Sequence, residues 1–267
     1  MTEVKSEGGV VFHRFGLLEG FVHALSGREG GVSRGPFASL NLGFGVGDEA
    51  EAVVENRRRF AEAAGFDLGS VVACRQVLGN AVAWVSAIHR GRGALEPESA
   101  LAETDALVSD TPGVVLMGFS ADCPLVAIAD PMRGAVGLAH ASRKGTFGRV
   151  VGRTVEAMVS LFGCEPSAMR AVIGPSICPA CYEVGEETLE ECRAGWPEGE
   201  RFFARSGGRL VFDLRSANRA QLVGCGLSEE RVEVVEACTR CRQDRFFSHR
   251  GSGGRTGRFV FVLGVPG

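Results

Sequence analysis

A cysteine and a histidine enclose two apolar runs in the middle of the chain. The stretch from Ala121 to His140 reads ADCPLVAIADPMRGAVGLAH, with Cys123 just before the first run and His140 at the end of the second. The Asp-Pro turn between the runs is short enough for a hairpin, and a hairpin of antiparallel strands places both of these residues at one edge of a sheet. The spacing therefore predicts that Cys123 and His140 meet.

A thiol beside an imidazole has three interpretations. The imidazole can act as a base that activates the sulfur as a nucleophile. The two side chains can also be two ligands of a zinc site that needs one more. In the third interpretation the cysteine is inert and buried and the histidine is hydrogen-bonded. The spacing alone leaves all three open.

Two C-x-x-C pairs form a second candidate site. They are Cys178 with Cys181 and Cys238 with Cys241, and such pairs are a recognised pattern of structural zinc. Their separation of 57 residues (238 − 181) is longer than the usual spacing of about 15–20. Reduced thiols that pack near one another without metal are the alternative.

Two glycine-rich segments carry groups that suit an anion. Residues 248–258, SHRGSGGRTGR, combine His249 with three arginines, whose guanidinium groups fit a phosphate or a carboxylate. Residues 27–45, GREGGVSRGPFASLNLGFG, have a backbone free to turn tightly and to present N–H groups. A long surface loop is the alternative for both segments.

The elements that must position these residues alternate between strands and helices. We expect strands at 71–77 and 81–88, paired as a hairpin across Gly79-Asn80, and further strands at 106–108, 114–119, 171–174, 232–236 and 259–265. We expect helices at 48–64, where Arg57 to Arg59 form a solvated face, and at 146–162, 185–193 and 213–226. This mixed order without a linker indicates one α/β (mixed α+β) domain over residues 1–267.

Composition limits the partners. The chain of 267 residues has 29 Lys and Arg against 32 Asp and Glu, so it lacks the positive field that supports nucleic-acid binding. It has no apolar run near the ~20 residues of a membrane span and no apolar signal region at its polar start. Nine cysteines in a chain of this length indicate reduced thiols. We therefore expect a cytoplasmic protein with neither nucleic acid nor membrane as partner.

Several ordered segments resemble one family. They are GREGGVSRGPFASLNLGFGVGDE, TDALVSDTPGV, SADCPLVAIADP, AVGLAHASRKG, IGPSICPACYEVGEE, FDLRSANRAQL and CTRCRQDRFFSHRGSGGRTGR. They are similar to the motifs of the laccase-domain family, also called the multicopper polyphenol oxidase or YfiH-type family, which includes purine nucleoside phosphorylases and peptidoglycan-editing factors. The resemblance runs from about Phe21 to Leu263.

The resemblance implies one YfiH-like α/β domain of layered mixed sheets flanked by helices, with a His-Cys-His zinc site. Cys123 and His140 match the second and third ligands, whereas the first ligand position, in Gln76-Val77-Leu78-Gly79, is Leu78. Leucine cannot coordinate zinc, so the expected cofactor keeps two ligands here. After His140 the family has Gly-Trp-Arg, and this chain has Ser-Arg-Lys, which keeps positive charge at Arg143 and Lys144 without the aromatic ring.

The resemblance also implies an activity, the phosphorolysis of adenosine- or inosine-type nucleosides to a base and a sugar 1-phosphate. The candidate catalytic residues are then Cys123, His140 and Arg28, with Arg28 as the phosphate contact. The candidate substrate-binding residues are Asn41, Gln76, Arg143 and Lys144. The expected partners are a purine nucleoside and phosphate, and the expected state is a monomer or a homodimer.

Two other functions stay open. Leu78 and the altered loop after His140 suit a catalytically impaired homologue that binds a nucleotide, a cell-wall precursor or a protein partner. A copper polyphenol oxidase is the third hypothesis. Five histidines without a His-x-His pair argue against it, because several copper centres need many imidazole ligands.

Overall fold

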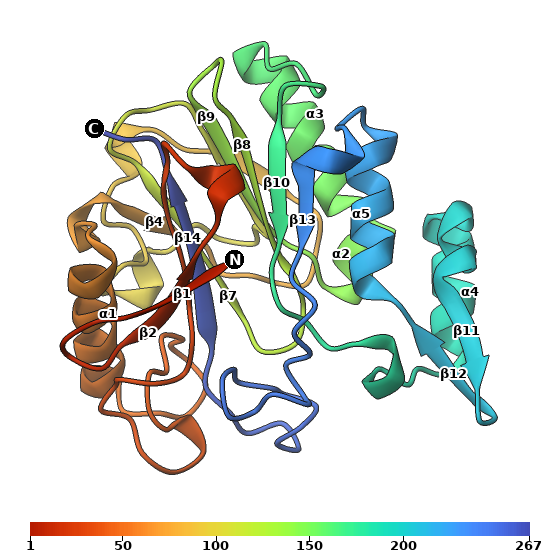
Figure 1. Ribbon diagram of the computed structural model, residues 1–267, viewed down its shortest axis with the longest axis horizontal. Coiled ribbons are helices and arrows are strands. Elements are labelled where there is room, and N and C mark those ends of the chain that lie inside the picture. Colours follow the sequence, from red (N-terminus) through yellow and green to blue (C-terminus); the bar gives the residue numbers. More distant parts are fainter.

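Four layers make up the protein in the computed structural model, which describes residues 1–267 (Figure 1). Helix α1 (Ala50–Ala64) covers a first sheet, and helices α3 (Val150–Phe162) and α5 (Leu214–Gly224) cover a second. The first sheet has the order β1 (Thr2–Lys5), β2 (Val11–Arg14), β3 (Val22–Ser26), β14 (Phe259–Gly264), β7 (Val115–Ser120), β4 (Val71–Ala73). The second has the order β13 (Val232–Val234), β10 (Arg170–Ile173), β8 (Leu125–Asp130), β9 (Ala135–His140), β6 (Ala106–Ser109), β5 (Val82–Trp84).

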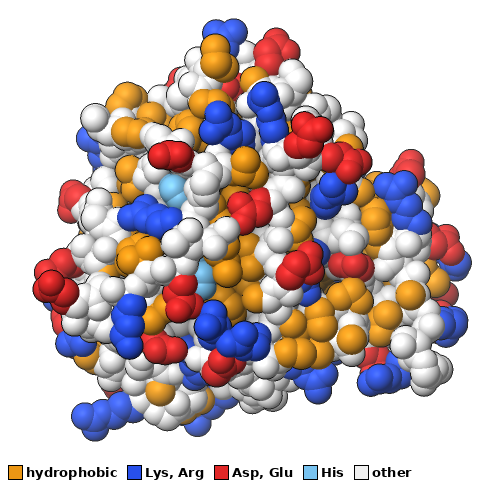
Figure 2. Space-filling view, in the orientation of Figure 1, with side chains coloured by type: hydrophobic (Ala, Val, Ile, Leu, Met, Phe, Trp, Pro, Cys, Tyr) orange, Lys and Arg blue, Asp and Glu red, His pale blue; other side chains and the backbone are white.

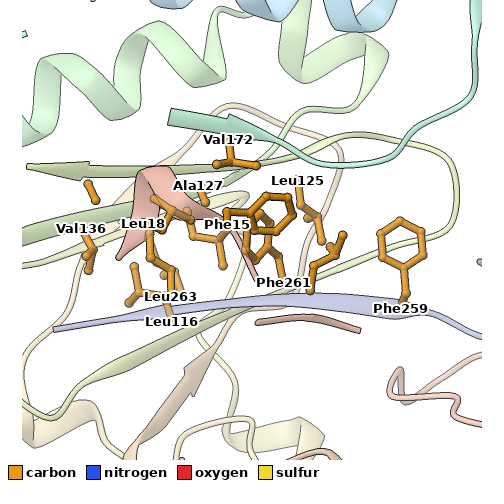
Figure 3. Packing of buried hydrophobic residues seen from close by; sticks show 14 of the residues in the cluster. Phe15, Leu18, Leu116, Leu125, Ala127, Val136, Val172, Phe259, Phe261 and Leu263 are labelled. Carbon is orange, nitrogen blue, oxygen red and sulfur yellow. The ribbon is translucent and has the colours of Figure 1, made fainter. Parts of the chain in front are cut away.

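The largest hydrophobic core lies between the two sheets. Along β14, Phe259, Phe261 and Leu263 point into this core, and the intervening Val260 and Val262 pack in the cluster that contains α1. A strand with both faces covered has no polar side, which explains the unbroken apolar run. Figure 3 shows these side chains meeting residues of β8, β9 and β10 across the gap between the sheets.

Helix α3 covers the outer face of the second sheet. Its apolar positions recur at helical spacing, and Val151 and Val155 are buried in one cluster with Val126 and Ile128 of β8. At Gly137 of β9, a Cβ atom would lie only 2.8 Å from Thr154 Cγ2 and 2.9 Å from Met158 Sδ. The missing side chain therefore allows the helix to approach this strand closely.

A small lateral unit stands beside this body (Figure 1). It consists of α4 (Glu186–Gly195) and the two-stranded sheet of β11 (Phe203–Ser206) and β12 (Arg209–Phe212). It has its own cluster of seven buried residues, which includes Phe147, Trp196 and Phe212. Phe147 ends the short helix α2 (Arg143–Phe147), so α2 connects the unit to the main body.

The structure corrects three of the sequence predictions. The expected hairpin of 71–77 and 81–88 is wrong: β4 pairs parallel with β7 in the first sheet, and β5 pairs parallel with β6 in the second. The expected helix over 146–162 is divided, because Gly148 ends α2 and Arg149 adopts a left-handed backbone with φ of 58° before α3.

The third correction concerns Arg57, which was expected on a solvated face and is only 2% exposed. Its guanidinium donates to the carbonyls of Leu42, Gly93 and Ala94 at 2.7–2.8 Å. Helical periodicity does not reveal this role, because the acceptors lie outside the helix, Leu42 in the loop before it and Gly93 and Ala94 in a loop well after it.

Charged side chains of both signs are interspersed on the face shown in Figure 2, in agreement with the net charge of −3. None of the helices combines the length and the apolar character that a bilayer crossing requires.

Candidate active site

The hairpin of β8 and β9 brings Cys123 and His140 to one edge of the second sheet, as the spacing predicted. Leu125 pairs with His140 in the antiparallel register, and Cys123 lies two residues before Leu125. The sulfur of Cys123 interacts with the His140 ring closely enough to raise the pKa of the imidazole. His140 is 6% exposed, and Cys123 is half-buried.

Asp105 completes this array, at the residue just before β6. Its Oδ1 lies 3.0 Å from His140 Nδ1, and it is 1% exposed. The same carboxylate accepts the backbone N–H groups of Val77, Leu78 and Gly79 at 2.8–3.1 Å. Because an ionised carboxylate only accepts hydrogen bonds, Nδ1 of His140 carries the proton that joins them. The ring orientation is thereby fixed.

The charges of this array favour an imidazolium. Burial lowers the pKa of His140, but the hydrogen bond to the Asp105 carboxylate and the interaction with the Cys123 sulfur outweigh it and raise the pKa to about 9. Burial also opposes ionisation of Asp105. Its hydrogen bonds with His140, Gly79 and Val77 prevail and lower the pKa of the carboxyl group. At neutral pH the site therefore holds a proton on His140 and a negative charge on Asp105.

Asp122 holds the loop that carries Cys123. Its backbone has φ of 128°, a conformation that non-glycine residues rarely adopt. Its Oδ1 accepts the hydroxyls of Thr239 and Ser248, each at 2.6 Å, and its Oδ2 accepts the N–H of Arg250 at 2.7 Å. Three bonds from a segment more than a hundred residues away stabilise this strained turn, and they place Cys123.

A tyrosine and an arginine lie near Cys123, and two further arginines lie near the tyrosine. Tyr182 lies near Cys123, Arg143 and Arg250, and burial is the main cause that raises its pKa to about 12. The Arg250 guanidinium lies 5.2 Å from the centre of the Tyr182 ring. Arg258 is half-buried, lies near Asp122 and Cys123, and donates to the carbonyls of Thr256 and Gly257. These guanidinium groups suit an anion beside the thiol.

Two of the expected substrate-binding residues have their amides occupied by the protein. Gln76 donates to the carbonyl of Phe119 and accepts its N–H, each at 2.8 Å. Asn41 is fully buried, donates to Gly43 O and Asp48 Oδ2, and accepts the N–H groups of Gly43 and Arg258. In this structure both side chains organise loops, and Asn41 fixes the backbone of Arg258.

Arg28, the expected phosphate contact, forms its hydrogen bonds with backbone carbonyls of two other segments. Its guanidinium donates twice to the carbonyl of Ala38 and once to that of Gln243, over the ring of Phe247. None of its hydrogen bonds reaches Cys123 or His140. It lines a surface pocket with His13 and Arg245 instead.

The two basic residues after His140 differ in their surroundings. Arg143 donates to Thr188 Oγ1 at 2.9 Å and pairs with Glu191 at 3.2 Å, which connects it to α4. Its charge also acts on Tyr182 beside Cys123. Lys144 is exposed.

The donors around Cys123 and His140 do not fit the three-ligand zinc site of the family resemblance. Leu78 stands at the first ligand position, 50% exposed, with a left-handed backbone and no donor atom. The one group of three or more His, Cys, Asp or Glu side chains with ligand atoms near one another is Cys178, Cys181, Cys238 and Cys241. These four cysteines form a possible metal site elsewhere.

Sequence reasoning missed Asp105, Asp122 and Tyr182. An acid directly before a buried apolar run, as in Thr104-Asp105-Ala106-Leu107-Val108, is a usable signal for Asp105. Asp122 lies in the stretch that drew attention first. Tyr182, the single tyrosine of the chain, follows the first C-x-x-C pair.

Two stacked sheets between helical layers make this an α/β protein of four layers, with a thiol–imidazole–carboxylate array at one sheet edge. The chain belongs to the multi-copper polyphenol oxidoreductase laccase family, whose model matches residues 22–266. This confirms the family resemblance of the sequence motifs.

Named relatives and solved structures cover almost the whole chain. It is 40% identical over 247 residues to the purine nucleoside phosphorylase YlmD of Geobacillus stearothermophilus, over 92% of this chain and 90% of that one. It is 42% identical to a purine nucleoside phosphorylase of Deinococcus radiodurans, over 91% and 89%. A protein of an unknown prokaryote named adenosine deaminase RL5 is 35% identical, over 89% and 91%.

Two crystal structures agree with the fold. That of YlmD from Geobacillus stearothermophilus superposes with a TM-score of 0.93 at 37% identity, over 99% of both chains. That of a YfiH protein from Bacillus licheniformis superposes with a TM-score of 0.87 at 34% identity, over 91% of this chain and 92% of that one. The prediction of a mixed α/β fold with layered sheets is confirmed.

Proposed function

We propose that this protein is an enzyme that cleaves purine nucleosides with inorganic phosphate to a free base and a sugar 1-phosphate. The observation that carries the proposal is the array of Cys123 with the buried His140 and Asp105, with arginines in its neighbourhood. The names of relatives at 40% and 42% identity supply the reaction class. Adenosine- and inosine-type nucleosides are the proposed substrates.

In the proposed reaction, the bond between the sugar C1′ and the purine nitrogen breaks and its electron pair leaves with the base. A phosphate oxygen forms the new bond to C1′. Arg143, Arg250 and Arg258 are the proposed phosphate contacts. Arg258 lies near Cys123, and the charges of Arg143 and Arg250 act on Tyr182, which is itself near Cys123. Holding the phosphate against the sugar lowers the barrier by positioning.

The departing base needs a proton, and the imidazolium of His140 is its proposed source. A hydrogen phosphate ion loses its own proton when it becomes the sugar ester, and this proton restores His140. Asp105 keeps the ring oriented throughout, and Cys123 positions the ring from the other side. The family zinc takes no part in these steps, since the donors beside Leu78 do not fit it.

The test is a chromatographic assay of purified protein with inosine or adenosine and phosphate. We expect release of the base together with ribose 1-phosphate, and we expect Cys123→Ala and His140→Ala each to lower the rate by about 100-fold or more. Cys225→Ala is the matched control, since Cys225 is half-buried and lies away from the array. Absence of base release with any purine nucleoside would refute the proposal.

A second candidate, a homologue that binds a ligand without turnover, is favoured by Leu78. Calorimetry that shows nucleoside binding in a protein without phosphorolysis supports this candidate. Leu78→His then tests whether the missing imidazole is the cause. If this variant binds metal and regains phosphorolysis, the loss of that one ligand explains the lack of turnover. A copper oxidase is disfavoured, because five histidines cannot supply several copper centres.

We further propose that the protein works in the cytoplasm as a monomer or a homodimer, with no nucleic-acid or membrane partner. All nine cysteines are free, which fits a reducing compartment. Light scattering coupled to gel filtration measures the oligomeric state, and an assembly larger than a dimer would contradict that part of the proposal.

A further inference from the structure

Parallel strands bring the two C-x-x-C pairs together despite the long stretch of chain between them. β10 and β13 lie side by side and run in the same direction, so the segments that follow them leave the sheet at the same end. Ser176 then forms an isolated parallel bridge with Cys238, and Thr239 donates its N–H to Ser176 O. This places the turn of Cys178 and Cys181 against that of Cys238 and Cys241.

The four sulfur atoms have the spacing of a tetrahedral thiolate site. All lie within 4.8 Å of one another, and the Sγ atoms of Cys181 and Cys241 are 3.5 Å apart. Four thiolates around zinc at about 2.3 Å are roughly 3.8 Å from one another. The Cys178 N–H also donates to Cys238 Sγ at 3.3 Å, so the backbone already orients one sulfur.

Three of these four cysteines are more exposed than the cysteines that fill the core. Cys74, Cys164 and Cys192 are buried as single residues, at 7%, 1% and 0% exposure. In the cluster, Cys238 is buried, Cys178 and Cys181 are half-buried and Cys241 is exposed. Hydrophobic packing therefore does not account for the three thiols of the cluster that remain partly or fully open to solvent.

We propose that Cys178, Cys181, Cys238 and Cys241 bind one zinc ion as a structural tetrathiolate site. Each thiol that ligates the metal releases its proton to the solvent, and no oxidation is involved. This site is separate from Cys123 and His140, and the proposal does not depend on the nucleoside reaction.

The proposed ion holds the segments that fix the Cys123 loop. Ile177, next to Cys178, donates its N–H to Asp122 O at 2.9 Å, and Thr239, next to Cys238, donates its hydroxyl to Asp122 Oδ1 at 2.6 Å. Zinc at the cluster therefore stabilises both contacts to the strained residue before Cys123.

Metal analysis of the full-length protein, purified under reducing conditions with zinc supplied, tests the proposal. We expect one zinc per chain by mass spectrometry. We expect at least tenfold weaker zinc binding in Cys241→Ser, measured by competition with a chelator, and none in the double variant Cys181→Ser/Cys241→Ser. Cys241 is exposed, so its substitution removes a ligand without opening the core. Cys225→Ser and Cys123→Ser are the controls, and both should keep the zinc.

Cobalt substitution gives a readout that needs no variant. Co²⁺ held by four thiolates produces intense visible and sulfur-to-metal absorption bands, and we expect the reduced protein to show them and added zinc to remove them. A reduced protein that binds neither ion would overturn the proposal. So would unchanged zinc affinity in the double variant, or zinc that is lost in Cys123→Ser while the four cysteines remain.

Discussion

Asp105 connects three parts of the chain through one carboxylate. It accepts the N–H groups of Val77, Leu78 and Gly79 and faces His140 Nδ1. The turn that carries Leu78 and the strand end that carries His140 are thereby held in one arrangement. The Asp105 carboxylate accepts from four donors. Replacing it by an asparagine amide of the same shape would turn one of its accepting oxygens into a donor.

Asp105→Asn is therefore expected to destabilise the fold by about 2–4 kcal/mol in urea denaturation, because buried N–H groups lose their acceptor. The pKa of His140 should also fall, which NMR titration of the ring measures. Asp110→Asn, at an exposed acid, is the control and should stay within about 0.5 kcal/mol. An unchanged pKa of His140 in Asp105→Asn would disprove the assigned ion pair.

The raised pKa of His140 makes stability depend on pH in a defined direction. Its pKa is about 9 in the folded protein and 6.5 as the reference value, so the folded state binds the proton more tightly. The stabilisation is complete below pH 6.5 and is lost as the pH rises toward 9. Between pH 6.5 and 8.5 we expect a loss of about 2–3 kcal/mol in the wild type. A matching fall in His140→Gln would show that another group is responsible.

At the scale of elements, the contact between α3 and β9 depends on the missing side chain of Gly137. A Cβ atom there would lie 2.8 Å from Thr154 and 2.9 Å from Met158. Gly137→Ala should cost about 1–3 kcal/mol by overpacking. Gly224→Ala, in α5 with no atom near the added Cβ, should be neutral or stabilising. Thermal denaturation of the two variants compares them, and equal effects would contradict the packing argument.

The elements near the site show what a sequence can predict. The turn between β8 and β9 is local, so the spacing of Cys123 and His140 predicted their meeting, and helix periodicity predicted α1 within two residues of its start. The false hairpin at Gly79-Asn80 had an equally local turn signal. In the structure the N–H of Gly79 instead donates to Asp105, 26 residues further along the chain, and no pattern within the turn reveals that partner.

At the scale of the molecule, we propose that residues 1–267 form one domain, because a single core of 23 buried residues joins both sheets. The lateral unit of α4, β11 and β12 depends on a cluster of only seven. We expect its amides to exchange hydrogen faster than those of β7, β8 and β14, since local opening exposes little apolar surface. Mass spectrometry of peptides from 186–212 measures this, and equal protection would argue against a weaker unit.

The turn of the β8–β9 hairpin lies at the far end of the strands from Cys123 and His140. Met132 in this turn is 80% exposed, and six strand residues at about 3.3 Å each separate it from the site. A dye or an immobilising tether attached at position 132 would therefore sit roughly 20 Å from the reacting groups. Position 132 is thus a suitable attachment point for surface immobilisation or single-molecule labelling, because a group attached there does not cover Cys123 and His140.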